Sequence, residues 1–450
     1  MEENEIYVTN NGQGYTPMGG ERQPKDKGGR YFWVGLFTGL IIALITTGSV
    51  YAVSRIQYAD AIKKLEANQK DKDNNKNKDN NKDGSDSSGE WDHEISEDTV
   101  EKMDLIESII EENYYKDEDI DREAMENGAY KGMVSSLGDP YSEYYSAEEL
   151  QSLYQSTAGI YYGIGAYVSL DEATKYGKIS GIIEGTPAEE ADLRENDIIY
   201  KVDGKDVYGM TLTEIVSLVK GEENTTVRLT LVRDGVQIEK DVVRRKVEAP
   251  TVKFEMLDDD IAYIQITEFD TITIQQFTEA MAMARGNNMK GLVLDLRSNP
   301  GGSLASVISI ARQLLPEGLI VYTEDKYGER AEYKSDGKRE IDVPMVVLVN
   351  GNSASASEIL AGAIKDYGVG YLIGTTTFGK GIVQKPIELS DGSAVKLTIS
   401  SYYTPKGVNI HGIGIEPDEV IEFDSELYYS DEKIDNQLER AKEYLQERIN

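Results

Sequence analysis

The 450-residue chain contains no cysteine and only two histidines, His93 and His411. It therefore has no disulfide, which fits a protein outside the cytoplasm that avoids stray disulfides. His93 lies in a polar linker and His411 in a turn, so a histidine-based triad is not favoured over a base of another kind. The sequence has no metal-ligand spacing, phosphate-binding loop or internal repeat, and we expect no metal or cofactor.

Basic residues are also scarce, since 47 lysines and arginines face 81 aspartates and glutamates, for a net charge of −34. Such a chain is repelled by phosphate backbones, so nucleic acid is excluded as a partner.

One long apolar run occurs, over residues 31–54, and it carries no charged side chain. As a helix its 24 residues would span about 36 Å, enough for a bilayer core of about 30 Å. Cations precede it at Arg22, Lys25, Lys27 and Arg30, which favours a cytoplasmic N-terminal tail, residues 1–30. The alternative is a signal peptide cleaved after Val50-Tyr51-Ala52. We expect an uncleaved single-pass anchor in the cell membrane with the rest of the chain extracytoplasmic.

Polar composition marks the next segment, because no aliphatic residue occurs between Ala67 and Trp91. Residues 55–96 are predicted to be a disordered linker. Residues 97–156 carry helical patterns, and residues 426–450 form a tail with a helix from Asn436 to Ile449. We interpret that last helix as a dimer or lid element.

The most informative segment runs from Gly351 to Glu358 and contains three serines. Lys380 follows Ser355 by 25 residues, in the loop Phe378-Gly379-Lys380-Gly381. A serine hydroxyl needs a base to become a nucleophile, and a lysine desolvated by burial can serve. The pKa of such a lysine has to fall from about 10.4 towards 7 or 8. The alternative is that the serines merely cap the helix that follows.

Topology favours the catalytic interpretation. Residues 345–350 read as a buried parallel strand, residues 357–367 as a helix and residues 370–374 as the next strand. In a right-handed βαβ unit both strands end at one sheet edge, so Ser355 and Lys380 are predicted to meet there.

A third strand, residues 290–297, is predicted to end at the same edge in Ser298-Asn299-Pro300-Gly301-Gly302. Such a glycine pair lets backbone N–H groups turn outward to hold an oxyanion, although the same letters also suit a simple turn.

These motifs, together with Asp295-Leu296-Arg297, Gln384 and the run from Gly412 to Asp418, resemble the carboxyl-terminal processing proteases, S41-type serine peptidases with a PDZ domain. The resemblance covers about residues 97–423. It implies that Ser355 is the nucleophile, Lys380 the general base and Gln384 the residue that orients the lysine amine. It also implies oxyanion donors at the backbone of Ala356 and of Gly302 or its neighbour Gly301.

Residues 157–247 look like a PDZ domain, with strands at 227–232 and 236–243 around an Arg-Asp-Gly turn. The resemblance makes Gly163, Ile164, Gly165 and Ala166 the carboxylate-binding loop. The helix from Leu212 to Val219 is then the other wall of the groove. Such domains take up a peptide as an added strand and hold its terminal carboxylate on backbone amides.

The resemblance predicts an α/β (α+β mixed) fold: a crotonase-like or ClpP-like ββα protease core, residues 248–425, with an inserted PDZ domain, a helical N-terminal region and one transmembrane helix. The predicted function is a membrane-anchored serine endopeptidase that recognises free C-terminal tails of extracytoplasmic proteins and cleaves with a Ser-Lys dyad. An inactive PDZ scaffold is the alternative. A third hypothesis, an acyl-CoA enzyme of the crotonase type, does not account for the inserted PDZ domain. In relatives the N-terminal helices help to dimerise or shape the entrance, and a role in packing alone is the alternative, so whether this protein is a homodimer is left open.

Overall fold

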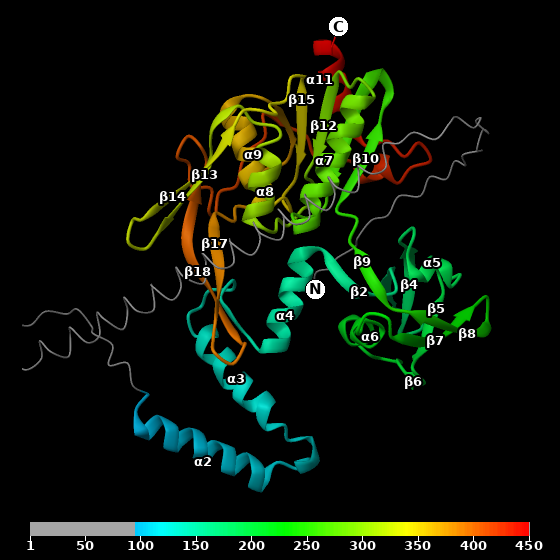
Figure 1. The fold of residues 1–450 in the computed structure, drawn as a ribbon, viewed down its shortest axis with the longest axis vertical. Coiled ribbons are helices and arrows are strands. Elements are labelled where there is room, and N and C mark those ends of the chain that lie inside the picture. The colour runs from blue at the N-terminus through cyan, green and yellow to red at the C-terminus, as the bar shows by residue number, and fades with distance from the viewer. Residues whose placement is uncertain (1–94, 450) are drawn as a thin grey trace, which may run out of the picture. The chain divides into compact units, whose positions relative to one another are not determined.

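The computed structural model describes residues 95–449 (Figure 1). The chain divides after Glu118 into two units. The described part of the first unit contains α2 (Glu97–Asn113) and the start of a 3-10 turn, η1 (Asp117–Asp119). Helix α2 begins after Ser96, whose hydroxyl accepts a hydrogen bond from Thr99 N, and buries none of its side chains. Two acidic residues in its first turn suit the positive end of the helix dipole.

The protease core is built on a six-stranded sheet, ordered β10-β11-β12-β15-β16-β19. Only the β10–β11 pair is antiparallel. Every residue of the two central strands, β12 and β15, is buried, as expected for parallel strands covered on both faces. The strands are β10 (Val252–Met256), β11 (Ile261–Ile266), β12 (Gly291–Asp295), β15 (Met345–Val349), β16 (Tyr371–Gly374) and β19 (Glu419–Val420).

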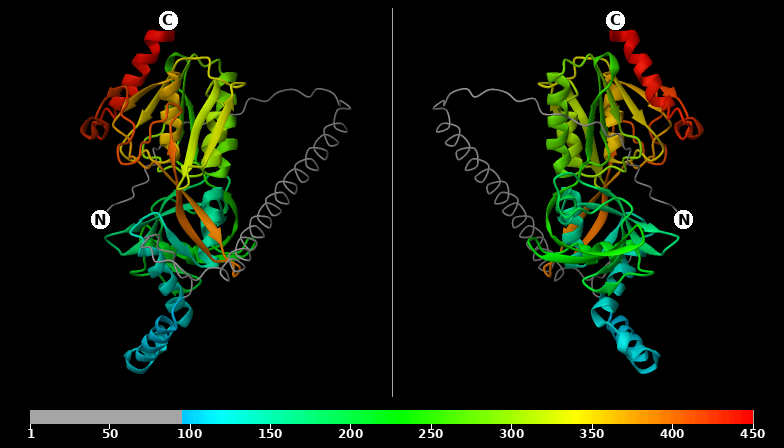
Figure 2. Two further views of the ribbon diagram at one scale, coloured as in Figure 1. Left: turned by 90° about the vertical axis from the view of Figure 1, so that its left-hand side faces the viewer. Right: turned by 90° about the vertical axis from the view of Figure 1, so that its right-hand side faces the viewer.

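Helices cover both faces of this sheet (Figure 2). The main hydrophobic core lies between the sheet and α7 (Thr271–Gly286), α8 (Leu304–Ala311) and α9 (Ala356–Tyr367). On the other face, α11 (Asn436–Ile449) buries Leu445 completely against the central strands. The helix therefore forms part of the core itself, which the interpretation as a dimer or lid element did not include.

A second, antiparallel sheet contains a long hairpin of β17 (Ile382–Glu388) and β18 (Ala394–Tyr403). Strand β18 also pairs with β13 (Glu317–Asp325), which pairs with β14 (Arg330–Asp336). At its other end β18 pairs with β1 (Glu143–Tyr145). The helical region before the PDZ domain therefore contributes a strand to the protease core. Its helices in this unit are α3 (Arg122–Ser135) and α4 (Ala147–Ala158).

The PDZ segment has its own sheet and its own hydrophobic core. The strand order is β3-β4-β5-β7-β8, with β3 at an edge, and a short ribbon of β2 and β9 stands before it. The predicted hairpin and the helix from Leu212 to Val219 are confirmed. The elements are β2 (Ile160–Gly163), β3 (Ala166–Asp171), β4 (Tyr176–Ile182), α5 (Pro187–Glu190), β5 (Ile198–Val202), β6 (Lys205–Asp206), α6 (Leu212–Val219), β7 (Thr226–Arg233), β8 (Val236–Val243) and β9 (Arg245–Glu248).

No helix within residues 95–449 is long and apolar enough to cross a bilayer. The predicted tail (1–30), the predicted membrane helix (31–54) and nearly all of the predicted linker (55–96) lie outside the described residues.

Candidate active site

Ser355 lies at the turn between β15 and α9, and its backbone is unusual. Its φ is 54° and its ψ −111°, a region that non-glycine residues rarely occupy. The side chain is half-buried and stands at the N-cap position of α9. The residue thus occupies the capping position of the alternative interpretation, but in a strained conformation that plain capping does not require.

The other two serines of the cluster are fully buried and serve structure. Ser353 Oγ donates to Leu296 O at 2.8 Å, and Ser357 Oγ donates to Asn299 O at 2.9 Å. Both acceptors belong to the turn that follows β12. These bonds hold the ends of two neighbouring strands together and leave Ser355 as the only serine of the three with an accessible side chain.

The glycine turn after β12 lies directly against Ser355. A Cβ placed on Gly301 would come within 2.8 Å of Ser355 Cβ and 3.0 Å of Ala356 N. The Gly301 N–H already donates to Asn299 Oδ1 at 2.9 Å. Among the described residues, the Gly302 N–H makes no hydrogen bond. Of the two glycines, Gly302 therefore has the amide that is free to bind another group.

Glu358 joins the serine turn to the lysine loop. Its carboxylate is fully buried and accepts hydrogen bonds from Ser355 N at 2.8 Å and Lys380 N at 2.9 Å. Gly379 N and Thr377 Oγ1 donate to the same carboxylate at 2.7 and 2.6 Å. Sequence reasoning treated Glu358 only as a helix-start residue. The serine followed three positions later by glutamate was the signal, but nothing local showed that the glutamate would reach the lysine loop.

Lys380 is half-buried, and its Nζ lies 4.3 Å from the centroid of the Tyr141 ring. Burial lowers the pKa of Lys380 below its usual value, and the nearby Lys396 ammonium lowers this pKa further. The carboxylates of Asp139 and Glu358 act in the opposite direction. The net shift favours the neutral amine that a general base needs.

The side chains of the predicted dyad are not hydrogen-bonded to each other within the described part of the chain. No hydrogen bond among the described residues joins Ser355 Oγ to Lys380 Nζ, and Gln384 Nε2 donates to Thr398 Oγ1 at 3.2 Å instead of reaching the lysine. The buried Tyr402 hydroxyl lies within hydrogen-bond distance of the carbonyls of both Ser355 and Lys380. Tyr402, like Glu358, was not predicted.

His411 supports the lysine loop. Its Nδ1 accepts a hydrogen bond from Gly381 N at 3.3 Å, next to Lys380. This bond uses the imidazole as a structural group.

In the PDZ domain the predicted carboxylate loop connects β2 to β3. Its carbonyls are engaged: Ile164 O accepts from Ala188 N at 2.7 Å, and Gly165 O accepts from Ile183 N at 3.0 Å. The Ile164 and Gly165 N–H groups make no hydrogen bond within the described part of the chain. Gly165 has φ +82°, and a Cβ there would lie 2.3 Å from Thr186 Cβ. Gly163 ends β2 and Ala166 begins β3, so unpaired amides stand beside a sheet edge.

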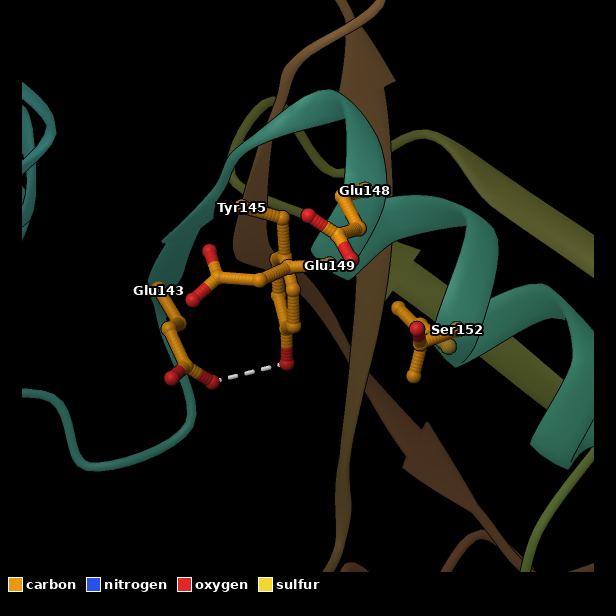
Figure 3. Close-up of a pocket in the computed structure, with 6 residues that line it drawn as sticks. Glu143, Tyr145, Glu148, Glu149 and Ser152 are labelled. Atoms are coloured by element: carbon orange, nitrogen blue, oxygen red, sulfur yellow. Dashed lines mark hydrogen bonds between the residues drawn. The ribbon is translucent and has the colours of Figure 1, made fainter. Parts of the chain in front are cut away.

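A pocket of about 390 Å³ lies on β1 and α4 (Figure 3). The Tyr145 hydroxyl donates to Glu143 at 2.7 Å, and Glu149 pairs with Lys131 at 2.5 Å. None of the predicted site residues lines it, and no cluster of metal-ligating side chains occurs in residues 95–449. The lining residues are Glu143, Tyr145, Glu148, Glu149, Ser152 and Leu153.

Known families account for most of the chain. Peptidase family S41 matches residues 260–421, a PDZ domain matches residues 178–233, and the N-terminal domain of the activating protease CtpB matches residues 43–149. The carboxy-terminal processing protease CtpA of Bacillus subtilis is 40% identical over 321 residues, which cover 70% of this chain and 68% of that protein. The chain belongs to the carboxyl-terminal processing proteases. The predicted family, a serine peptidase family, and the mixed α/β fold with a PDZ domain are thereby confirmed.

Other members of the family are similar over stretches of comparable length. A probable CtpA-like serine protease of Staphylococcus aureus is 36% identical over 326 residues, 72% of this chain and 65% of that protein. The chain thus spans about two thirds of these curated relatives. Among solved structures, a photosystem II D1 C-terminal processing protease is 32% identical, with a TM-score of 0.44, over 74% of this chain and 92% of that one.

Proposed function

We propose that this protein is a membrane-anchored serine endopeptidase that binds the free C-terminal tails of extracytoplasmic proteins through its PDZ domain and cleaves them with Ser355 and Lys380. The observation that carries the proposal is the buried Glu358 carboxylate, which binds the backbone amides of both residues. This bridge draws the serine turn and the lysine loop to one place. Family membership and the lowered pKa of Lys380 add support.

In the proposed reaction, Ser355 Oγ attacks the peptide carbonyl carbon while neutral Lys380 Nζ takes the hydroxyl proton. The oxyanion that forms accepts hydrogen bonds from the Ala356 and Gly302 N–H groups. The C–N bond then breaks, and the Lys380 ammonium gives its proton to the leaving amine. Water, deprotonated by Lys380, attacks the ester carbonyl of the acyl-enzyme, the bond to Ser355 Oγ breaks, and the Lys380 ammonium returns its proton to that oxygen. Gln384 orients the lysine amine during these steps.

The PDZ domain is proposed to take up the substrate tail. Strand β3 lies at the edge of its sheet, so an extended peptide can pair with it as an additional strand. The unpaired amides of Ile164 and Gly165 suit a terminal carboxylate at the end of that strand.

Membrane attachment is proposed from residues 31–54, with the N-terminus cytoplasmic and the catalytic part outside. To test the topology, protease is added to intact cells stripped of their wall. Digestion of the segment after Arg55 is expected, and its protection would reverse the orientation.

One observation favours the alternative of an inactive PDZ scaffold: no hydrogen bond joins Ser355 Oγ to Lys380 Nζ among the described residues, and Gln384 is bonded to Thr398. The two functions are separated by turnover of unstructured tail peptides by the wild type, Ser355→Ala and Lys380→Ala. The endopeptidase should lose turnover in both variants. Equal turnover in all three proteins would reject the Ser-Lys mechanism. No turnover by the wild type would favour the scaffold.

A further inference from the structure

The segment from Asp139 to Ser142, just before β1, is fixed to the β17–β18 hairpin. Asp139 Oδ2 accepts hydrogen bonds from Ser142 Oγ at 2.6 Å and from Thr398 Oγ1 at 2.7 Å. Thr398 N donates to Ser142 Oγ at 3.1 Å. The segment therefore has a defined position beside the strand that carries Thr398.

This segment also supplies the aromatic face beside Lys380. The Nζ atom lies 4.3 Å from the centroid of the Tyr141 ring, and Tyr141 N donates to Asp139 Oδ1 at 3.0 Å, which fixes the backbone. The negative face of an aromatic ring attracts an ammonium far more strongly than a neutral amine. Tyr141 in this position favours the form of Lys380 that cannot act as a base.

Gln384 is held by the same network. Its Nε2 donates to Thr398 Oγ1, and Thr398 Oγ1 in turn donates to Asp139. The residue that the proposed reaction needs beside Lys380 is thus two hydrogen bonds away from Asp139.

We propose that Asp139 and Tyr141 form a resting clamp, which opposes deprotonation of the Lys380 amine beneath the ring and holds Gln384 on Thr398 until the clamp is displaced. The two are positioning residues, since they act through Lys380 and Gln384. The inference rests on the proposed function, because it assumes that Lys380 is the general base.

Several charged and titratable groups face Lys380, and their effects differ in sign. Asp139 and Glu358 favour its ammonium form, whereas Lys396 and burial oppose it. Lys396 is anchored on β1 by the Tyr145 hydroxyl at 2.5 Å. Removing the aromatic face or the Asp139 charge, with burial kept, should therefore lower the pKa of Lys380. Asp139, Tyr141, Glu358 and Lys396 act on the Lys380 amine, while Tyr402 and His411 contact the backbone of its loop.

The test compares the pH dependence of kcat/KM for the full chain and its variants. In Tyr141→Leu, which keeps an apolar cover, the acid limb should move to lower pH by about half a unit to one and a half units. Tyr141→Phe keeps the ring and should leave the limb in place. Tyr327→Leu is the matched control, because it removes a similar lysine–tyrosine contact on the surface: Lys326 Nζ lies 4.9 Å from the centroid of the exposed Tyr327 ring. This control should leave the acid limb unchanged.

A second readout does not depend on turnover. In a Ser355→Ala background, competitive acetylation of Lys380 by acetic anhydride across pH, followed by mass spectrometry, reports the pKa of the amine directly. Tyr141→Leu and Asp139→Asn should each lower the pKa of Lys380. If thermal denaturation shows that Tyr141→Leu is unfolded, the result for Asp139→Asn alone tests the clamp. An unchanged or raised pKa would overturn the clamp. Loss of turnover in Lys380→Ala would then still uphold the proposed function, whereas full turnover there would reject that function instead.

Discussion

At the scale of single residues, Ser355 has a backbone conformation that costs a non-glycine residue about 1–3 kcal/mol. Other contacts must therefore stabilise this conformation. Glu358 does so through the hydrogen bond from Ser355 N, and the same carboxylate fixes the lysine loop. A buried carboxylate is stable only when its oxygens are paired, and four donors surround this one. The glutamate therefore couples the proposed nucleophile and base.

We predict that Glu358→Gln lowers kcat/KM by about 100-fold or more. The amide replaces one acceptor oxygen with a donor, so the serine turn and the lysine loop should both shift. A displacement of catalytic groups by about 1 Å can have an effect of this size. Peptide turnover measures the loss. Glu149→Gln is the matched control, since Glu149 occupies the same capping-box position in α4. Equal turnover in both variants would contradict the coupling role of Glu358.

We also predict a pH dependence from Lys380. Its pKa is lowered by burial, and the base acts in its neutral form, so kcat/KM should be low below that pKa and rise from neutral towards alkaline pH. The profile is measured with a peptide that has no group titrating in this range. A flat profile between about pH 6 and 10 would count against a titrating lysine.

At the scale of elements, the C-terminal helix supports the end of the sheet that carries the proposed active site. Arg297 starts the turn that leads to Gly302, and its guanidinium binds Asp295 at 2.6 Å. Asp435 and Gln437, at the start of α11, hold the same guanidinium at 2.8 and 2.9 Å. Helix α11 thus covers one face of the sheet and fixes the arginine beside the glycine turn.

We predict that Leu445→Ala lowers the free energy of unfolding by about 2–5 kcal/mol, because it leaves a cavity between α11 and the sheet. Unfolding in urea measures the change. Glu447→Ala, on the exposed face of the same helix, should change it by no more than about 0.5 kcal/mol. Equal effects would show that α11 does not pack on the core in solution.

At the scale of the whole molecule, the PDZ domain is inserted into the protease chain with its two connections side by side. Ile160 of β2 pairs with Glu248 of β9, so the chain enters and leaves the domain at one ribbon. The segment before the insertion supplies β1 and the loop that reaches Lys380. The homodimer and the membrane anchor stay predictions.

We predict that Gly165→Ala weakens the preference of the protein for peptides with a free C-terminus over their amides. The added Cβ would meet Thr186 at 2.3 Å and distort the loop amides. Fluorescence anisotropy with paired peptides measures the preference, which should fall about tenfold, equivalent to about 1.4 kcal/mol. Gly235→Ala is the control, since this glycine also has positive φ but has open space around it. An unchanged preference in Gly165→Ala would contradict the proposed carboxylate loop.

The sequence by itself determined the strand, turn and helix around Ser355, the lysine loop, the glycine turn and the PDZ elements, because period, turn residues and capping are local properties of the chain. Only the tertiary structure decided that Glu358 joins serine turn to lysine loop, that Gln384 binds Thr398, and that α11 completes the core. It also decided that Tyr141 covers Lys380. Such contacts join distant residues, as with Asp139 and Thr398, which are 259 positions apart, and no local pattern encodes which buried polar groups will meet.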